Sequence, residues 1–186
     1  MEGENEKSDN IVWVDCEMSG LDPKTDALLE VAVVITDKNM NVLCIGPNIV
    51  IHQNEDVLRN MNQWCIEHHG MSGLTQQVRE STITLKEAER QIVRVVKQWT
   101  KKGKCPLAGN SIGQDAKFLD KYMPDLMSQL HYRIIDVSTV KELCRRKNPK
   151  VFDSKPEKKL AHRALDDIME SIEELKYYTE NFFITE

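Results

Sequence analysis

The chain has 186 residues, with 25 Lys and Arg against 30 Asp and Glu, so its formal net charge is −5. This length corresponds to about one domain, which can bury a core without disulfide or metal support. The negative net charge argues against broad electrostatic binding to nucleic acid or to an anionic membrane. A content of 40% hydrophobic and 30% charged residues excludes the disordered and fibrous classes.

The five cysteines are odd in number and show no repeating interval, which favours free thiols in a reducing compartment. No apolar run approaches the roughly 20 residues that span a bilayer, so no membrane association is expected. The start of the chain is acidic where a transit peptide would be basic. We therefore expect an intracellular protein, most simply a cytoplasmic one, although a mitochondrial or nuclear location and an upstream targeting segment stay open.

The N-terminal half predicts a disordered acidic tail over 1–10, followed by a single domain over 11–186. Short runs rich in β-branched residues, separated by turn residues, predict a three-stranded meander at 11–14, 28–35 and 42–51. The pattern then becomes helical at 57–69 and 84–100. Thr84 followed by Glu87 is typical of the capping box that opens a helix.

In the C-terminal half strands and helices alternate. We expect strands at 106–108 and 132–135, helices at 114–123, 138–146 and 161–179, and a loop over 147–159 that contains two prolines. A meander followed by alternating helices and strands predicts one three-layer α/β domain with a mixed sheet.

Two carboxylates, Asp15 and Glu17, end the first predicted strand. Residues two apart on a strand point to the same face, so both side chains project together. Like charges at the edge of an apolar strand repel each other unless a cation lies between them, and oxygen ligands suit Mg²⁺ or Mn²⁺. The alternative is that the strand ends there and both groups are simply solvated.

The segment after the strand at 106–108 runs from Gly109 to Asp115. A strand that opens into a helix N-terminus is where α/β proteins place ligands, because free N–H groups there attract phosphate. Asp115 would lie in the first turn of that helix. Its carboxylate could equally do no more than complement the helix dipole.

The last predicted helix opens with His162 and carries two adjacent acids, Asp166 and Asp167. Its apolar stripe comprises Ala161, Leu165, Ile168, Ile172 and Leu175. At about 100° per residue, Asp166 falls roughly 150° from the centre of this stripe, which points it to solvent. Asp167 falls on the flank, beside the small residues Ala164 and Ser171. The helical spacing does not say where His162 points.

Taken together, these segments resemble the DEDD exonuclease superfamily in its histidine subclass, and most closely the oligoribonuclease (small fragment nuclease) family. The likeness extends from about Val12 to Phe182 and is carried by WVDCEMSGLD at 13–22, PLAGNS at 106–111, FLDKYMP at 118–124, HYRIIDVST at 131–139 and HRALDD at 162–167. The resemblance implies a ribonuclease H-like three-layer fold with a mixed five-stranded sheet flanked by helices. It also implies 3′ to 5′ hydrolysis of very short RNA, two to about five nucleotides long, by a homodimer.

The resemblance also assigns roles within the active site. Two divalent cations, Mg²⁺ or Mn²⁺, would be held by carboxylates at the positions of Asp15, Glu17, Asp115 and Asp167, with His162 as the general base. Asp15 would bridge the ions, Glu17 and Asp167 would serve the ion that holds the attacking water, and Asp115 would complete the second ion. Two such ions can stabilise both the attacking and the leaving oxygens of a phosphoryl displacement.

Substrate recognition follows from the same resemblance. Leu21 matches a wedge between two bases and Trp64 a stacking aromatic, although each could be an ordinary core residue. Positions that hold the 5′ phosphate and close its pocket correspond to Ser111, Arg133, Ser138 and Thr139, with His69 alongside. Tyr132 matches a residue that the partner subunit contributes. Two departures are Cys16, where an aliphatic residue is usual, and Lys147-Asn148, where a Trp is expected.

Other functions remain to be weighed. Cys65, His68 and His69 lack the second ligand pair of a zinc site, and the thiolate of Cys16 is disfavoured beside two acids. An exonuclease for longer RNA or DNA ends would share every catalytic residue, and an inactive RNA-binding protein could use the same fold. The net charge does not exclude RNA, because Arg133 to Arg163 holds ten Lys and Arg against four Asp and Glu.

Overall fold

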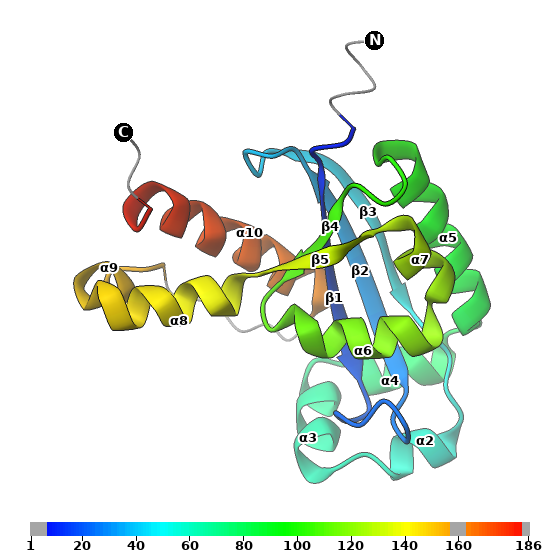
Figure 1. Ribbon diagram of the computed structural model, residues 1–186. Coiled ribbons are helices and arrows are strands. Elements are labelled where there is room, and N and C mark those ends of the chain that lie inside the picture. The colour runs from blue at the N-terminus through cyan, green and yellow to red at the C-terminus, as the bar shows by residue number, and fades with distance from the viewer. Residues whose placement is uncertain (1–6, 157–162, 184–186) are drawn as a thin grey trace.

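The computed structural model describes residues 7–156 and 163–183. They form a five-stranded sheet in the order β3-β2-β1-β4-β5, with helices on both faces (Figure 1). The strands are β1 (Ile11–Met18), β2 (Leu28–Thr36), β3 (Val42–Val50), β4 (Pro106–Gly109) and β5 (His131–Asp136). β1 pairs antiparallel with β2 and parallel with β4, so the sheet is mixed, and the predicted three-layer α/β fold is confirmed.

The helices fall into three groups (Figure 1). One face of the sheet carries α5 (Leu85–Trp99), α6 (Ile112–Tyr122) and α7 (Pro124–Gln129). The other side carries α8 (Val137–Lys147), α9 (Pro149–Asp153) and α10 (Ala164–Asn181). Near the end of β1 lie α2 (Glu55–Arg59), α3 (Gln63–Met71) and α4 (Leu74–Glu80). None of the helices described in these two ranges is long and apolar enough to cross a membrane.

The alternation of side chains along β1 builds two separate cores. Val12 and Val14 join the large apolar cluster with α5, α6 and α7, whereas Trp13 joins the smaller cluster with α10. The side chains of a strand point alternately to the two faces of its sheet. Asp15 and Glu17 therefore share the face of Trp13 and look toward α10.

The first predicted helix is divided into two in the structure. The prediction of one helix over 57–69 is wrong, because a break at Asn60–Asn62 separates α2 from α3. Each of these helices starts at its own capping asparagine: Asn54 accepts a hydrogen bond from the Val57 N–H at 3.0 Å, and Asn62 accepts one from Cys65 at 2.9 Å. Asn62, which lies inside the predicted helix, thus starts a new helix instead of continuing one.

Prolines also begin helices in this chain rather than only ending them. α7 starts at Pro124, and α9 starts at Pro149 within the segment predicted as a loop over 147–159. A proline fits the first helical position because its missing N–H would have no partner there. The loop prediction is therefore wrong over Pro149–Asp153.

Part of the predicted N-terminal tail packs against the domain. Asn10 is buried, and its side-chain Nδ2 donates to the carbonyl of Trp99 at 2.7 Å, while the carbonyl of Lys7 accepts from the Lys101 N–H at 3.3 Å. The last carbonyls of a helix have no partner within that helix, and Asn10 supplies one for the end of α5. Residues 1–6 of the tail lie outside the described ranges.

Candidate active site

Three carboxylates from two elements meet at the end of the sheet. Asp15 and Glu17 project from β1, and Asp167 projects from the first turn of α10. One carboxylate oxygen from each residue lies within 4.8 Å of the other two. Within 7–156 and 163–183 this is the only set of three or more potential ligand side chains that lie so close together. The expected pairing of Asp15 with Glu17 is thus realised, and a third acid joins them.

The orientation predicted for the two adjacent acids of α10 is confirmed. Asp166 is exposed, whereas Asp167 is half-buried between Ala164 and Ser171, which are both buried. The N–H of Asp167 donates to the carbonyl of Arg163 at 3.0 Å, which closes the first turn of the helix. The small neighbours leave room for the end of β1 beside the carboxylate of Asp167.

Asp115 lies beside this group but not within it. Its side chain is 6% exposed, and its Oδ1 accepts a hydrogen bond from the backbone N–H of Cys16 at 3.0 Å. This bond ties the first turns of α6 to β1 between the two acids of the strand. The arrangement brings Asp115 near Asp15, whose pKa its negative charge raises.

The site is electrostatically unfavourable without a cation. Burial raises the pKa of Asp15 well above its ordinary value, and the charges of Asp115 and Glu17 raise it further. Burial raises the pKa of Glu17 to about 8, with a contribution from Asp167. Burial also raises the pKa of Asp115 to about 7, although the Cys16 N–H opposes this shift. Each shift means that the negative form is destabilised where it lies.

A divalent cation would relieve this destabilisation. Carboxylate oxygens are the ligands that Mg²⁺ and Mn²⁺ prefer, and three of them converge within 4.8 Å. Cys16 is no competing nucleophile, because burial raises the pKa of its thiol well above the ordinary value. All five cysteines are free thiols, as the sequence predicts. The donor set therefore fits a hard divalent ion.

An ion pair that the sequence analysis missed holds the start of α10 against the sheet. Glu30, opposite Glu17 in the β1–β2 register, is completely buried. Its carboxylate accepts two hydrogen bonds from Arg163, from Nε at 3.1 Å and from an Nη at 2.7 Å. The same guanidinium donates to Gln77 of α4 at 3.0 Å. A glutamate inside an otherwise apolar strand is the signal that could have revealed this pair.

His162, the predicted general base, lies outside the described residues. In the sequence it directly precedes Arg163, whose side chain the ion pair with Glu30 fixes. The residue after His162 is therefore anchored to the sheet at the edge of the carboxylate group.

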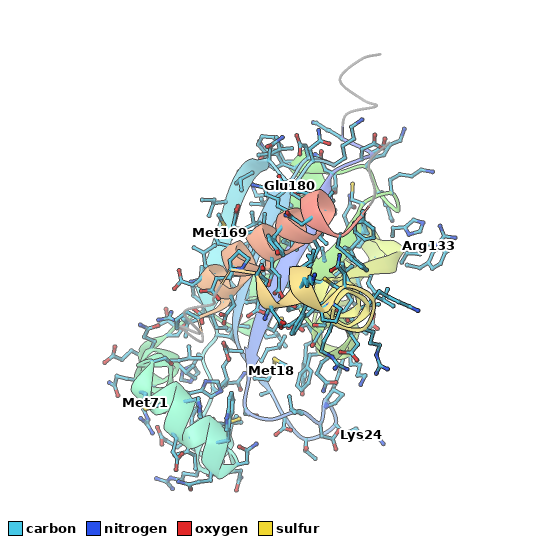
Figure 2. All side chains as sticks on the ribbon, turned by 90° about the vertical axis from the view of Figure 1, so that its left-hand side faces the viewer. Met18, Lys24, Met71, Arg133, Met169 and Glu180 are labelled. Carbon is cyan, nitrogen blue, oxygen red and sulfur yellow. The ribbon has the colours of Figure 1, made fainter. Side chains whose placement is uncertain are left out.

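A pocket opens next to Glu17. It has a volume of about 400 Å³, within the range of small-molecule sites, and its lining comprises Cys16, Glu17, Met18, Gly20, Leu21, Asn62, Trp64, Cys65 and His69. Figure 2 shows Met18 between the loop that carries Lys24 and helix α3, which ends at Met71. The pocket therefore has one wall from the loop after β1 and another from α3.

Two large apolar side chains of this pocket stay exposed. Leu21 is 69% and Trp64 is 53% exposed, so neither is an ordinary core residue. Trp64 stacks on His68 with the ring centroids 3.9 Å apart. An exposed leucine and an exposed tryptophan on facing walls suit contact with flat aromatic groups such as bases.

His69 is buried between the pocket and the carboxylates. Its Nε2 lies 2.9 Å from the carbonyl of Met18, so this nitrogen carries the hydrogen. Its Nδ1 lies 3.8 Å from Glu17 Oε2. The imidazole thus links α3 to the end of β1 and lies beside Glu17.

Asp26 organises the loop that presents Leu21. Its carboxylate accepts hydrogen bonds from the Ser19 hydroxyl at 3.3 Å and from the Asp22 N–H at 2.9 Å. A Cβ at Gly20 would collide with this carboxylate, so any other residue there would have to displace Asp26. Gln114 of α6 donates to the carbonyl of Leu21 at 2.6 Å. The exposed leucine therefore stands on a fixed backbone.

The predicted phosphate-binding residues lie between β4 and α8. The two hydroxyl oxygens of Ser111 and Ser138 are 3.0 Å apart. Asp136 Oδ1 accepts the backbone N–H groups of both serines at 2.9 Å. Arg133 on β5 and Thr139 in α8 are exposed. Figure 2 shows Arg133 well apart from Met18, on the outer side of the sheet.

β5 forms one edge of the sheet and presents apolar side chains to solvent. Tyr132 is 81% exposed, and Ile134 and Leu143 of the adjoining helix α8 are also exposed. The guanidinium of Arg133 lies 5.4 Å from the centre of the Tyr132 ring. An uncovered edge strand with apolar side chains can pair with another chain.

Comparison with known proteins agrees with this geometry. The exonuclease family RNase_T matches residues 12–175. A protein from Homo sapiens named "Oligoribonuclease, mitochondrial" is 57% identical over 173 residues, which cover 93% of this chain and 73% of the relative. An oligoribonuclease from Colwellia psychrerythraea is 53% identical over 174 residues, which cover 94% of this chain and 96% of the relative.

A solved structure supports the fold independently. Exonuclease I from Methylocaldum szegediense superposes with a TM-score of 0.71 at 18% identity, and the match covers 93% of this chain. This chain spans about two fifths of the length of that exonuclease, since the match covers 41% of it. The architecture is the exonuclease, or ribonuclease H-like, fold that the sequence predicts.

Proposed function

We propose that this chain, which belongs to the oligoribonucleases within the RNase_T exonuclease family, removes nucleotides from the 3′ end of very short RNA. The products would be nucleoside 5′-monophosphates. The observation that carries this proposal is the group of three carboxylates within 4.8 Å, beside a pocket of about 400 Å³. The carboxylates would lie at the reacting phosphodiester, and the pocket would receive the terminal base.

The proposed cofactors are two divalent cations, Mg²⁺ or Mn²⁺. Asp15 would bridge them, Glu17 and Asp167 would hold one ion, and Asp115 would complete the other. The separation of Asp115 from the group of three supports a division into two sites. Two such ions, when bound, stabilise the attacking and leaving oxygens of an in-line phosphoryl displacement.

His162 would accept a proton from the attacking water. A group that titrates near neutral pH suits this task. Its place in the sequence supports the role, because it directly precedes the anchored Arg163 and lies five residues before Asp167. The protein would thus bring its base and the metal ligand Asp167 to the phosphodiester from neighbouring positions of the chain.

Base recognition would depend on the two walls of the pocket. Leu21 would insert between the two bases of a dinucleotide, and Trp64 would support stacking. The exposure of both side chains supports this assignment. Stacking tolerates any sequence because every base has a π-face. His69 would act indirectly by holding the backbone at Met18, next to Glu17.

The 5′ phosphate would bind at Ser111 and Ser138, with Arg133 and Thr139 closing the pocket. The 3.0 Å contact of the two hydroxyls supports a common binding position. A site that caps the 5′ end limits the length of RNA that fits between it and the metal ions. This limit would favour dinucleotides over longer chains.

We also propose a homodimer formed through the β5 edge, with Tyr132 reaching the site of the partner subunit. The exposed Tyr132, Ile134 and Leu143 support such an interface. Sedimentation of the purified protein would measure its mass. A monomer that retains full dinucleotide activity would contradict the role given to Tyr132.

The location would be a reducing compartment, because all five cysteines are free. The relative from Homo sapiens is named as mitochondrial. Cell fractionation of the endogenous protein would decide between the mitochondrion, the cytoplasm and the nucleus.

The decisive experiment follows release of mononucleotides from a 5′-phosphorylated dinucleotide and from a long single-stranded RNA. We expect rapid cleavage of the dinucleotide, slow cleavage of the long RNA, and loss of both reactions in EDTA with recovery in excess Mg²⁺ or Mn²⁺. Preference for the long RNA would favour an end-trimming exonuclease. Binding without metal-dependent cleavage would indicate an inactive RNA-binding protein.

A further inference from the structure

Asn110 occupies a position between the two halves of the proposed site. It follows β4 directly and contacts both α8 and α10. Its side-chain Nδ2 donates to the hydroxyl of Ser171 at 2.8 Å and to the carboxylate of Glu174 at 3.2 Å. Its Oδ1 accepts the hydroxyl of Ser138 at 3.2 Å. One amide therefore connects the metal-binding helix with a residue of the phosphate site.

The amide can take only one orientation. Glu174 is buried, and its carboxylate accepts further hydrogen bonds and ion pairs, from the Tyr178 hydroxyl at 3.3 Å and from Lys141 at 3.4 Å. An ionised carboxylate has no hydrogen to donate, so the NH₂ of Asn110 must face it. The amide oxygen is thereby turned toward Ser138.

On the helix side, the connection reaches the residue that carries the metal ligand. Ser171 is buried, and its hydroxyl donates to the backbone carbonyl of Asp167 at 2.7 Å. A hydroxyl has one hydrogen to donate, so its oxygen is left to accept from Asn110. Asn110 thus acts on the turn of α10 that positions the Asp167 carboxylate.

On the phosphate side, the connection reaches a strained residue. Ser111 has a left-handed backbone with φ of 53°, a conformation that is uncommon for residues other than glycine. The N–H of Ser111 donates to Ser138 Oγ at 2.8 Å as well as to Asp136. Because the Ser138 hydroxyl gives its hydrogen to Asn110, the Ser111 hydroxyl is the one that can turn to a phosphate. Strain held in this way is a feature of ligand sites.

We propose that Asn110 is a positioning residue that couples the 5′-phosphate pocket at Ser111 and Ser138 to the metal-binding helix through Ser171. A phosphate bound to the Ser111 hydroxyl would fix Ser111, then Ser138 through the Ser111 N–H, then the Asn110 amide, and then the first turns of α10. Occupation of the pocket would in this way raise turnover and not only affinity. This inference rests on the proposed function and adds to it a physical means by which the enzyme favours a 5′-phosphorylated substrate.

The test compares dinucleotides with and without a 5′ phosphate in the wild-type protein, Asn110→Ala and Ser171→Ala. We expect the 5′ phosphate to increase kcat in the wild type and this increase to fall about tenfold in either variant, as expected when a buried hydrogen bond is lost. The kcat for the unphosphorylated dinucleotide should change much less. The double variant should lose little more than either single variant, because the two residues act in one chain of contacts.

A matched control comes from the same helix. Thr179 donates to the carbonyl of Leu175 at 2.8 Å, which is the same bond to the preceding turn that Ser171 makes. Thr179→Val should therefore keep the effect of the 5′ phosphate. If this variant lost the effect as well, a general change in α10 would explain the result and the coupling would be refuted.

Three other outcomes are informative. An equal loss of kcat on both dinucleotides in Asn110→Ala and Ser171→Ala would show a merely structural role and overturn the coupling. A full effect of the 5′ phosphate in both variants would also overturn it, while leaving the proposed function intact. If the wild type showed no effect of the 5′ phosphate, the proposed phosphate pocket itself would fail. Ser171→Ala keeps the test usable if Asn110→Ala does not fold, because it leaves the contacts of Ser138 in place.

Discussion

The two faces of the sheet are built on different physical terms. Between the sheet and α5, α6 and α7 lies a large cluster of apolar side chains. The face toward α10 has a smaller apolar cluster and buries polar groups beside it, among them Glu30, Ser171 and Glu174. The first face stabilises the protein by burial of apolar surface. On the second face, the repulsion between buried carboxylates offsets part of this stabilisation. This contrast predicts that changes on the first face affect stability alone, whereas changes on the second face also affect chemistry.

The largest effect is expected from removal of a metal ligand. Asp167→Asn should reduce dinucleotide cleavage by more than the roughly 10- to 100-fold that loss of an outer-shell partner causes. The melting temperature without metal should not fall, because one repelling charge is gone. The neighbouring Asp166→Asn is the control, since Asp166 is exposed, and it should keep full activity in the same cleavage assay. Equal losses in both variants would break the contrast.

Next is the buried ion pair that joins α10 to β2. Arg163→Gln leaves the fully buried Glu30 without its charged partner, which should lower the free energy of unfolding by about 3–5 kcal/mol. Adding Glu30→Gln should recover part of the loss. Arg145→Gln is the control, because Arg145 pairs with Glu142 at the surface and should change stability by no more than about 1 kcal/mol. Urea unfolding measures all four proteins.

The apolar face should respond in stability alone. Ile92 of α5 is completely buried, and Ile92→Ala should lower the free energy of unfolding by about 2–5 kcal/mol. Activity per folded molecule should stay at the wild-type value. Gln98→Ala, at an exposed position of the same helix, should stay within about 0.5 kcal/mol. A fall in kcat of folded Ile92→Ala would show that the two faces are not independent.

The smallest effect is a dependence of stability on pH and metal. Burial raises the pKa of Glu17 to about 8 from an ordinary value of 4.5, so between these values the folded protein binds more protons than the unfolded one. In the metal-free protein, the contribution of Glu17 to the free energy of unfolding should therefore be fully present below about pH 4.5. This contribution should be lost as the pH rises through 8. Calorimetry should show a melting temperature that falls by several degrees. Saturating Mg²⁺ should flatten this slope, because metal binding needs the deprotonated carboxylates.

Much of the fold follows from local patterns in the sequence. The three strands of the meander and the long helix α5 are found where periodicity places them, and the Thr84 hydroxyl accepts the Glu87 N–H at 3.2 Å as the capping motif predicts. The short helices α4, α7 and α9 were not predicted. They bury few residues each, and glycine or proline at their starts resembles a break in helical structure rather than a beginning.

The site could be predicted only as far as its motifs are local. The side of β1 that carries Asp15 and Glu17, and the contrast between Asp166 and Asp167, follow from strand and helix geometry. The contact of Arg163 with Glu30 joins residues 133 positions apart, and the contact of Asn110 with Ser171 joins residues 61 apart. No periodicity records such pairs, because they depend on how the elements pack.

Cys16 belongs to both faces at once. Its thiol packs in the apolar cluster between the sheet and α5, α6 and α7, while its backbone N–H donates to Asp115, which lies beside the group of three carboxylates. The backbone contribution is the same for every amino acid except proline. Evolution at position 16 is therefore free to exchange small apolar side chains without altering the chemistry. A single inserted or deleted residue within β1 would be far more harmful, because it would turn the flanking acids into the apolar layer.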